Sequence, residues 1–199
     1  MTAAGIVLAA GESSRLGQPK QLLAFRGATL LDAALATARA AGFDQVLVTL
    51  GGAGADVRAG VDLAGLEVVT NPDFGTGCAS SIRSALRAVR EEVDGIVLLL
   101  GDQPGASAEV IGELLAQAGS SSVGVCRYDD GLGHPLWFHR RMFDTLMNLH
   151  GDKAVWKLLD RHPELVREVR VARPLPRDVD TPEDYEAVRL ALAPVTRSG

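Results

Sequence analysis

The first candidate for chemistry is a short polar loop that follows an apolar run near the N-terminus. Ile6 to Ala10 is uniformly hydrophobic, which is typical of a strand covered on both faces of a parallel sheet. Open α/β sheets bind ligands at the carboxyl ends of their strands, where free backbone N–H groups and cations can contact phosphate oxygens. The run ends at a glycine and leads into small hydroxyl side chains and two cations, namely Gly11, Ser13, Ser14, Arg15 and Lys20. The loop therefore predicts anion binding, with a nucleoside triphosphate as the expected anion.

Neither of two familiar phosphate-binding motifs matches this loop. Five residues separate Gly11 from Gly17, and Lys20 lies three positions further on. The Walker loop instead has four residues between its glycines and a lysine directly after the second. The dinucleotide pattern Gly-x-Gly-x-x-Gly is also absent here. On these residues alone, an ordinary surface loop with solvated cations remains the alternative.

A carboxylate follows another apolar run. Gly95 to Leu100 predicts a central strand, and Asp102 comes next in the sequence Gly-Asp-Gln-Pro. A carboxylate at the end of a buried strand can hold a hard cation beside phosphates. The alternative is that Asp102 caps the following helix, but Ser107 can supply that cap itself. Asp102 is therefore predicted to bind a metal ion.

A second acidic motif lies near the C-terminus. Thr181 and Pro182 predict a helix start. Glu183 and Asp184 follow in the first turn, where the helix dipole favours acids, so we assign them no catalytic role. Asp178 and Asp180 are expected to alternate on a strand, so that one of them faces the cleft. We predict that Asp180 is the second metal-associated carboxylate. Two magnesium-binding acids beside a cationic loop suit phosphoryl or nucleotidyl transfer.

One further segment comes close to a dinucleotide-binding fingerprint. The stretch 75–80 reads Gly-Thr-Gly-Cys-Ala-Ser, with Ser80 where the third glycine would stand. It is predicted to open a helix, and helix N-termini bind many anions and polar rings. This segment is the sequence argument for a nicotinamide-using oxidoreductase. For Ser81, the next residue, a plain helix cap is an equal alternative.

The apolar runs and helical patterns alternate at short spacing, which predicts one α/β domain over residues 1–199. We expect a three-layer, Rossmann-like fold with a mostly parallel sheet and, in the second half, an antiparallel strand at the edge. Strands are predicted at 6–10, 45–50, 67–70, 95–100, 122–126, 135–138 and 166–171. Helices are predicted at 29–41, 56–60, 76–90, 108–118, 141–149, 154–160 and 182–192.

Composition excludes several classes of protein. The net charge of −5 argues against a general nucleic-acid binder, which usually carries a basic balance. No apolar run approaches the roughly 20 residues that span a membrane, and the short N-terminal run lacks the basic segment of a secretory signal. Two cysteines, Cys78 and Cys126, make neither a disulfide framework nor a four-ligand zinc site. A reduced, cytoplasmic setting is therefore expected.

Four motifs together resemble the MobA-like nucleotidyltransferases, and within them the molybdenum cofactor cytidylyltransferases most. The loop from Leu8 to Lys20 fills every position of Leu-Ala-Ala-Gly-x-Ser-x-Arg-Leu/Met-Gly-x-x-Lys. The other three are Leu-x-Gly-Asp-x-Pro at 99–104, Gly-His-Pro at 133–135 and Asp-Val-Asp-Thr-Pro-Glu-Asp-Tyr at 178–185. A fifth motif of the family, Gly-Asp-Lys/Arg-Gly, is Gly-Asp-Lys-Ala at 151–154 in this chain. Ala154 replaces the second glycine, which would change how closely the acceptor approaches this loop.

The resemblance implies a magnesium-dependent transfer of CMP from CTP to a phosphorylated acceptor, of the molybdopterin type, with release of pyrophosphate. It implies contact with the nucleotide for Leu8, Ala9, Ala10, Gly11, Ser13, Arg15 and Lys20. It makes Arg15, Lys20 and Asp102 catalytic and gives Mg²⁺ to Asp102 and Asp180. It places Ser80, Ser81 and His134 on the acceptor side. The expected partners are the triphosphate, the pterin acceptor and, transiently, molybdoenzymes, with neither nucleic acid nor membrane.

Ala10 is the reason for preferring CTP. The resembling guanylyltransferases carry Ala-Gly-Gly where this chain has Ala9-Ala10-Gly11. A methyl group at Ala10 would narrow the space for a purine base while packing against a pyrimidine ring. The alternative is that Ala10 merely continues the buried strand.

Three rival functions stay open on the sequence. A guanylyltransferase acting on the same cofactor shares these motifs. An NAD(P)H-dependent reductase related to nicotine blue oxidoreductase shares the loop. A non-catalytic domain that binds a nucleotide or cofactor is disfavoured, because Arg15, Lys20, Asp102 and Asp180 are all present.

Overall fold

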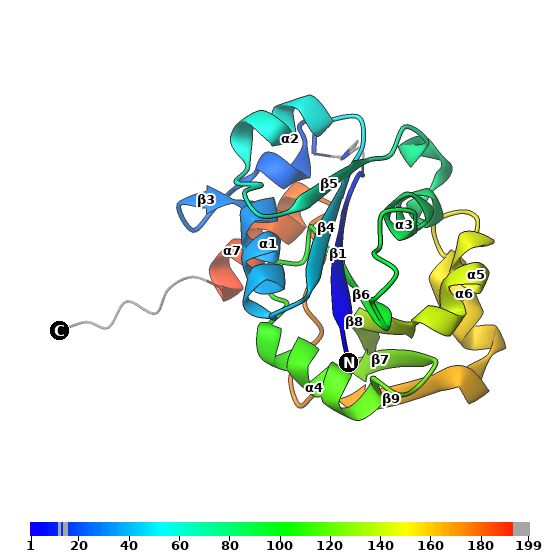
Figure 1. Ribbon diagram of the computed structural model, residues 1–199. Coiled ribbons are helices and arrows are strands. Elements are labelled where there is room, and N and C mark those ends of the chain that lie inside the picture. The colour runs from blue at the N-terminus through cyan, green and yellow to red at the C-terminus, as the bar shows by residue number, and fades with distance from the viewer. Residues whose placement is uncertain (12, 14–15, 193–199) are drawn as a thin grey trace.

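A seven-stranded sheet forms the centre of the molecule (Figure 1). The computed structural model describes residues 1–192 with the exception of 12, 14 and 15. The strands lie in the order β5-β4-β1-β6-β8-β7-β9, and β8 runs antiparallel to both of its neighbours. The strands are β1 (Ala3–Ala9), β4 (Gln45–Leu50), β5 (Glu67–Thr70), β6 (Gly95–Leu100), β7 (Val123–Arg127), β8 (Leu132–His139) and β9 (Val166–Arg170). A separate ribbon pairs β2 (Ala24–Phe25) with β3 (Ala28–Thr29).

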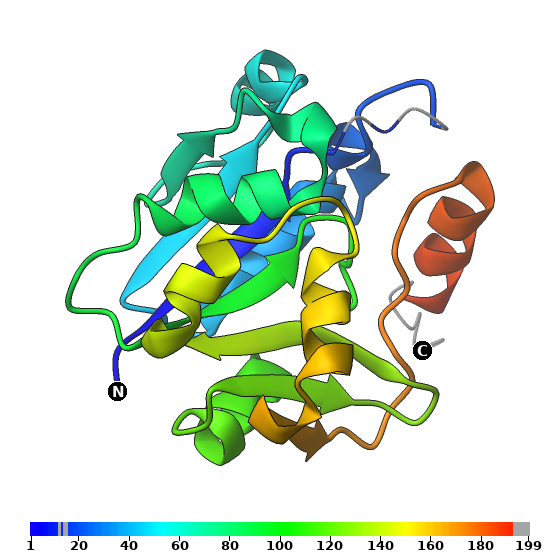
Figure 2. The same cartoon turned by 90° about the vertical axis from the view of Figure 1, so that its right-hand side faces the viewer.

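Helices cover both faces of the sheet, which gives three layers (Figure 1). One face carries α1 (Leu30–Ala40), α2 (Gly54–Gly60) and α4 (Ala108–Ala118). The other carries α3 (Cys78–Leu86), α5 (Phe143–Met147) and α6 (Ala154–Arg161). The last helix, α7 (Pro182–Ala191), lies beside the β2–β3 ribbon (Figure 2). Short 3-10 turns lie at Lys20–Leu22, Phe74–Thr76, Arg140–Met142 and Pro163–Leu165.

The predicted α/β class and mostly parallel sheet are confirmed, but the predicted edge position of the antiparallel strand is wrong. β8 lies in the interior of the sheet, between β6 and β7. Its residues Leu136, Trp137 and Phe138 are all fully buried. Trp137 packs into the core on one face of the sheet, and Leu136 and Phe138 pack into the core on the other face. A strand that is apolar on both faces is typical of the interior of a sheet covered by helices on both sides.

The helix predicted at 76–90 is shorter in the structure, where α3 spans Cys78–Leu86, because other contacts end it on both sides. Gly77, with φ of 103°, lies before the helix in a conformation that a helix cannot include. At the other end the buried Gln45 side chain donates to Ala88 O and accepts from the Arg90 N–H. Gln45 thereby satisfies backbone groups that would otherwise need further helical turns.

The remaining helix ends follow local capping rules. Thr29 and Asp32 form a reciprocal capping box at the start of α1, and Gly42, with φ of 72°, follows its end. Ser107 caps α4, which was the alternative role considered for Asp102. Within the residues described, no helix combines the length and the apolar character needed to cross a bilayer.

Candidate active site

A cleft with a volume of about 360 Å³ opens at the carboxyl ends of β1 and β6. Those strand ends form one wall, and the segment leading into α3 forms another with Asp152. Ser81, which is predicted to contact the acceptor, and Asp102, which is predicted to bind the metal, also line the cleft. Of the residues predicted to bind the nucleotide, those that line the cleft are Leu8, Ala9, Ala10, Gly11 and Lys20.

Two side chains tie the residues after β1 to the 3-10 turn at Lys20–Leu22. The buried Gln21 amide donates to Ala9 O at 2.8 Å and to Gly11 O at 3.1 Å. Ser13 Oγ accepts from the Lys20 backbone N–H at 2.8 Å. Ser13 is not among the residues that line the cleft, and its hydroxyl fixes the backbone of Lys20, which does line it.

Gln21 is a residue that the sequence analysis missed. Its signal was a polar amide directly between the predicted cation at Lys20 and the apolar pair Leu22-Leu23. A buried polar side chain must find partners, and here it finds backbone carbonyls of the loop. Arg15 lies outside the described residues, so its contact with phosphate stays a prediction.

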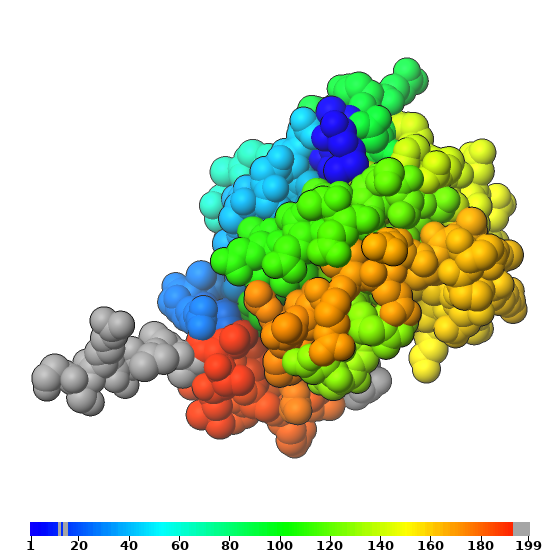
Figure 3. Space-filling model, turned by 90° about the horizontal axis from the view of Figure 1, so that it is seen from below, coloured from blue at the N-terminus to red at the C-terminus, as the bar shows by residue number. Residues whose placement is uncertain are grey.

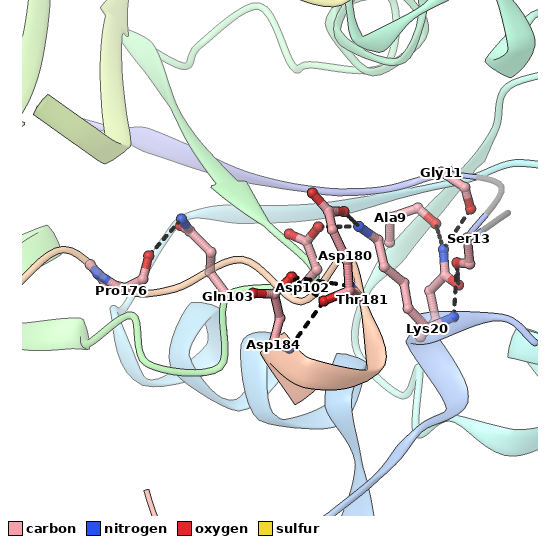
Figure 4. Close-up of polar contacts among 11 residues, drawn as sticks. Ala9, Gly11, Ser13, Lys20, Asp102, Gln103, Pro176, Asp180, Thr181 and Asp184 are labelled. Atoms are coloured by element: carbon pink, nitrogen blue, oxygen red, sulfur yellow. Dashed lines mark hydrogen bonds and ion pairs between the residues drawn. The ribbon is translucent and has the colours of Figure 1, made fainter. Parts of the chain in front are cut away.

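Lys20 stands between the two carboxylates predicted to bind metal (Figure 4). Its Nζ donates to Asp180 Oδ1 at 2.8 Å and also to Asp102 Oδ2. The Lys20 and Asp102 side chains are 14% and 17% exposed, whereas Asp180 is 51% exposed. Burial lowers the pKa of Lys20, but the two neighbouring carboxylates outweigh burial and raise this pKa above its ordinary value. Lys20 is therefore a cation at neutral pH.

Asp180 contacts Lys20 from the segment between β9 and α7, which crosses the surface toward α7 (Figure 3), and is itself not among the residues that line the cleft. The expected strand at 178–180 is wrong, since these residues belong to no strand. The Val179 N–H donates to Asp102 O at 3.1 Å, and Val179 itself is fully buried. Directly after Asp180, Thr181 and Asp184 form a reciprocal capping box at the start of α7. One backbone bond and one helix cap thus hold Asp180 opposite Asp102.

Asp178 is a third acid near this pair. Asp178 is exposed at the surface, and the partial burial of its carboxyl, together with the negative charge of Asp102, raises its pKa to about 6. The neighbouring Gln103 side chain donates to Pro176 O at 3.1 Å, which ties this segment to the end of β6. Asp178 therefore adds negative charge to the site above about pH 6.

The two predicted acceptor serines are held by one asparagine. The Asn71 amide donates to Ser80 Oγ at 2.8 Å and to Ser81 Oγ at 3.0 Å. Both serines are buried, and only Ser81 lines the cleft. Asn71 follows β5, so this bond pair fixes α3 against the carboxyl edge of the sheet. Ser80, the last residue of the segment that resembles a dinucleotide-binding fingerprint, therefore faces Asn71.

A loop before α6 closes the far end of the cleft, and the sequence analysis gave it no site residue. Asp152 Oδ1 accepts from the Cys78 N–H at 3.0 Å, and Gly151 O accepts from the Ala79 N–H at 3.3 Å. Gly77 is required here, because a Cβ on it would lie 2.7 Å from the Gly151 backbone. Burial and the charges of Asp152 and Asp102 raise the pKa of the Cys78 thiol to about 11. Cys78 is thus a neutral thiol in the cleft wall.

His134 is not among the residues that line the cleft. Its ring packs edge-on against Trp156 with centroids 5.6 Å apart. Burial lowers the pKa of His134 to about 4, so the ring is neutral near pH 7. The contact of His134 with an acceptor stays a prediction.

The donor set suits magnesium. Asp102 and Asp180 converge on a single cation, the Lys20 ammonium, and both offer carboxylate oxygens. Mg²⁺ is usually held by one or two carboxylates, with substrate phosphates and water completing its shell. Across the described residues, no group of three or more His, Cys, Asp or Glu side chains could hold a metal alone. The pair therefore fits a metal that binds with phosphates.

Comparison with known proteins assigns the family. The model of the MobA-like NTP transferase domain matches residues 5–166. The chain belongs to the MobA-like NTP transferase family. The matched span includes the loop, Asp102 and the α3 segment, whereas Asp180 lies beyond it.

The relatives of this MobA-like protein carry different names. It is 32% identical to "Purine catabolism protein PucB" of Bacillus subtilis (strain 168), over 95% of this chain and 97% of that protein. It is 30% identical to "Nicotine blue oxidoreductase" of Paenarthrobacter nicotinovorans, over 92% of each. It is 24% identical to "Molybdenum cofactor cytidylyltransferase" of Escherichia coli (strain K12), over 90% of this chain and 92% of that protein.

A solved structure is closer. The crystal structure of Rv0371C in complex with manganese, from Mycobacterium tuberculosis H37Rv, is 45% identical to this chain. The TM-score is 0.87, over 96% of this chain and 100% of that chain. The fold of the MobA-like protein is therefore shared along its whole described length.

Proposed function

We propose that this protein is a magnesium-dependent cytidylyltransferase that moves CMP from CTP onto a phosphorylated acceptor of the molybdopterin type. The observation that carries the proposal is the Lys20 ammonium held between Asp102 and Asp180 at the carboxyl ends of β1 and β6. A cation flanked by two carboxylates in such a cleft has the parts that nucleotidyl transfer needs.

In the proposed reaction an oxygen of the acceptor phosphate attacks the α-phosphorus of CTP. The bond from that phosphorus to the bridging oxygen breaks, and the electron pair leaves with pyrophosphate. Lys20 balances the charge that builds on the leaving phosphates, and the loop closed by Gln21 orients them. Asp102 and Asp180 would hold Mg²⁺, which supplies further neutralisation of phosphate charge when bound. An acceptor phosphate is already an anion at neutral pH, so no general base is required.

Two similarities support the metal and the acceptor. The related protein Rv0371C was crystallised with manganese, an ion with the same preference for oxygen ligands. The relative from Escherichia coli is named as a molybdenum cofactor cytidylyltransferase. We further propose that the enzyme works in the cytoplasm and passes its product to molybdoenzymes through transient contacts.

The test is pyrophosphate release by the purified protein, given each triphosphate in turn with reduced molybdopterin cofactor and Mg²⁺. We expect turnover with CTP to be the fastest. Faster turnover with GTP would replace the proposal by a guanylyltransferase, and no turnover with any triphosphate would overturn it. Asp160→Asn is the matched control for site variants, since Asp160 is an exposed acid on α6 that lies outside the residues lining the cleft.

A reductase is the second candidate. The 30% identity to a protein named nicotine blue oxidoreductase favours it. Oxidation of NADPH by the purified protein, followed at 340 nm with a quinone-like pigment as acceptor, separates the two candidates. Hydride transfer needs no divalent metal, so it would persist in EDTA and in Asp102→Asn.

A further inference from the structure

One ammonium group holds the position between the two carboxylates proposed to bind the metal. Lys20 Nζ contacts Asp102 Oδ2 and Asp180 Oδ1. Magnesium would bind through the same carboxylates, at about 2.0–2.1 Å from their oxygens. Lys20 and the metal therefore compete for one position.

The two cations cannot share that position. Lys20 and Asp102 are mostly buried, so charges between them are screened less than on the open surface. A dication placed beside the ammonium would be repelled by it, and each carboxylate would have to divide its oxygens between two cations. Binding of the metal therefore requires the ammonium to move away.

The chain permits that movement. Ser13 and the 3-10 turn at Lys20–Leu22 fix the backbone of Lys20, whereas its ammonium sits at the end of a flexible four-carbon stem. The stem passes the phosphate-binding loop, since a Cβ on Gly11 would lie 3.9 Å from Lys20 Cε. Phosphate oxygens bound at this loop would lie within reach of the same ammonium.

We propose that Lys20 is a placeholder cation: it blocks the metal position until a triphosphate draws its ammonium onto phosphate oxygens, so that metal and nucleotide bind together. The identity of the triphosphate rests on the proposed function. The competition itself rests only on Lys20, Asp102 and Asp180. The consequence is an ordered site, in which the metal binds weakly until the nucleotide is present.

The first test measures the metal alone. Mn²⁺ is titrated into nucleotide-free protein, and free Mn²⁺ is followed by electron paramagnetic resonance. We expect Lys20→Met to bind Mn²⁺ about tenfold more tightly than the wild type, and Lys20→Met/Asp102→Asn to lose that gain. Lys157→Met, which removes an exposed lysine of α6, should match the wild type. Equal or weaker binding by Lys20→Met would overturn the proposal.

The second test measures the nucleotide without metal. A methylene-bridged CTP analogue is titrated into the protein in EDTA by calorimetry. If Lys20 moves onto the phosphates, Lys20→Met should bind the analogue about tenfold more weakly than the wild type. Unchanged affinity would show that the Lys20 ammonium stays with the carboxylates, and would overturn the proposed movement of the ammonium onto the phosphates.

Two controls keep the tests informative. Circular dichroism checks each variant for folding, and Lys20→Gln repeats the comparison if Lys20→Met does not fold. The pyrophosphate assay separates this inference from the proposed function. A protein that gains Mn²⁺ affinity on loss of Lys20 but releases no pyrophosphate would retain the competition and lose the cytidylyltransferase assignment.

Discussion

The two halves of the sheet serve the cleft in different ways. In the parallel half, the residues directly after β1 and β6 line the cleft, and Asn71, directly after β5, holds Ser80 and Ser81. In the other half, β8 reverses direction, and its Gly-His-Pro motif lies against α6 through His134 and Trp156. Connecting segments of that half supply Asp152, which lines the cleft, and Asp180, which contacts Lys20.

The difference separates two ways of building a site. Residues after parallel strands are positioned by the sheet, because hydrogen-bonded neighbours fix where each strand ends. Asp152 and Asp180 are positioned instead by a helix N-terminus, a capping box and an ion pair. We therefore expect substitutions in the parallel half to change the chemistry most, and those in the other half to act more through stability.

The largest expected effect is that of Asp102→Asn. It removes one negative charge from the pair of carboxylates proposed to bind the metal, so turnover should fall about 10³-fold or more, with the fold intact. Pyrophosphate release and thermal melting measure the two quantities, with Asp160→Asn as control. Turnover within a few-fold of the wild type, still dependent on Mg²⁺, would remove Asp102 from the metal site.

The next effect concerns stability and lies in the other half. His134 has a pKa of about 4 in the folded protein against an ordinary value of 6.5, so only the unfolded chain takes up its proton between these values. Stability should therefore fall as the pH drops from 6.5 to 4, by at most about 3 kcal/mol. His134→Gln should lose this part of the pH dependence in denaturant titrations, and the exposed His150→Gln should keep it. An unchanged slope in His134→Gln would place the titration elsewhere.

Lys20→Ala tests the charge beside the phosphates. The triphosphate should lose about 1.5–3 kcal/mol of binding free energy, or roughly 10- to 150-fold in affinity, because a charged hydrogen bond is removed. CMP, which lacks the leaving phosphates, should lose less. Calorimetry with CTP and CMP gives both values, and equal losses would mean that Lys20 does not lie near the pyrophosphate.

Ala10→Gly is expected to have the smallest effect. Ala10 is 6% exposed and lines the cleft, so removal of its methyl group should reduce the proposed preference for CTP over GTP by about tenfold. Ala4→Gly makes the same change on β1 at a fully buried position outside the residues lining the cleft. The ratio of kcat/KM values for CTP and GTP is the measurement. A ratio that stays constant would assign base selection to groups other than Ala10.

The sequence was a good guide where a single run or cap decides the structure. The strands at 45–50, 67–70 and 95–100 and the helix at 108–118 agree with the predicted limits, because apolar runs bounded by glycine, proline or a capping serine leave few choices. The interior position of β8 was not accessible in this way. It depends on which strands pair, and pairing is decided by long-range packing.

The site was predictable in its residue types more than in its contacts. Asp102 and Lys20 were found from their positions after apolar runs, but their ion pair could not be read from residues so far apart in the chain. Gln21 and Asn71 were missed because their role is to satisfy backbone and hydroxyl groups, which becomes visible only when the partners are placed. Asp152 was missed for the same reason.

The backbone bond from Val179 to Asp102 ties the last part of the chain to the centre of the sheet. Every strand of the sheet in the described residues is complete by Arg170, whereas Asp180 comes later, on a segment with several exposed residues. A chain synthesised from its N-terminus therefore has its entire sheet before it has its second carboxylate. A protease cut within residues 172–178 would separate Asp180 from the part of the chain that carries Asp102 and would spare the sheet. Loss of activity after such a nick would report a severed connection rather than an unfolded protein.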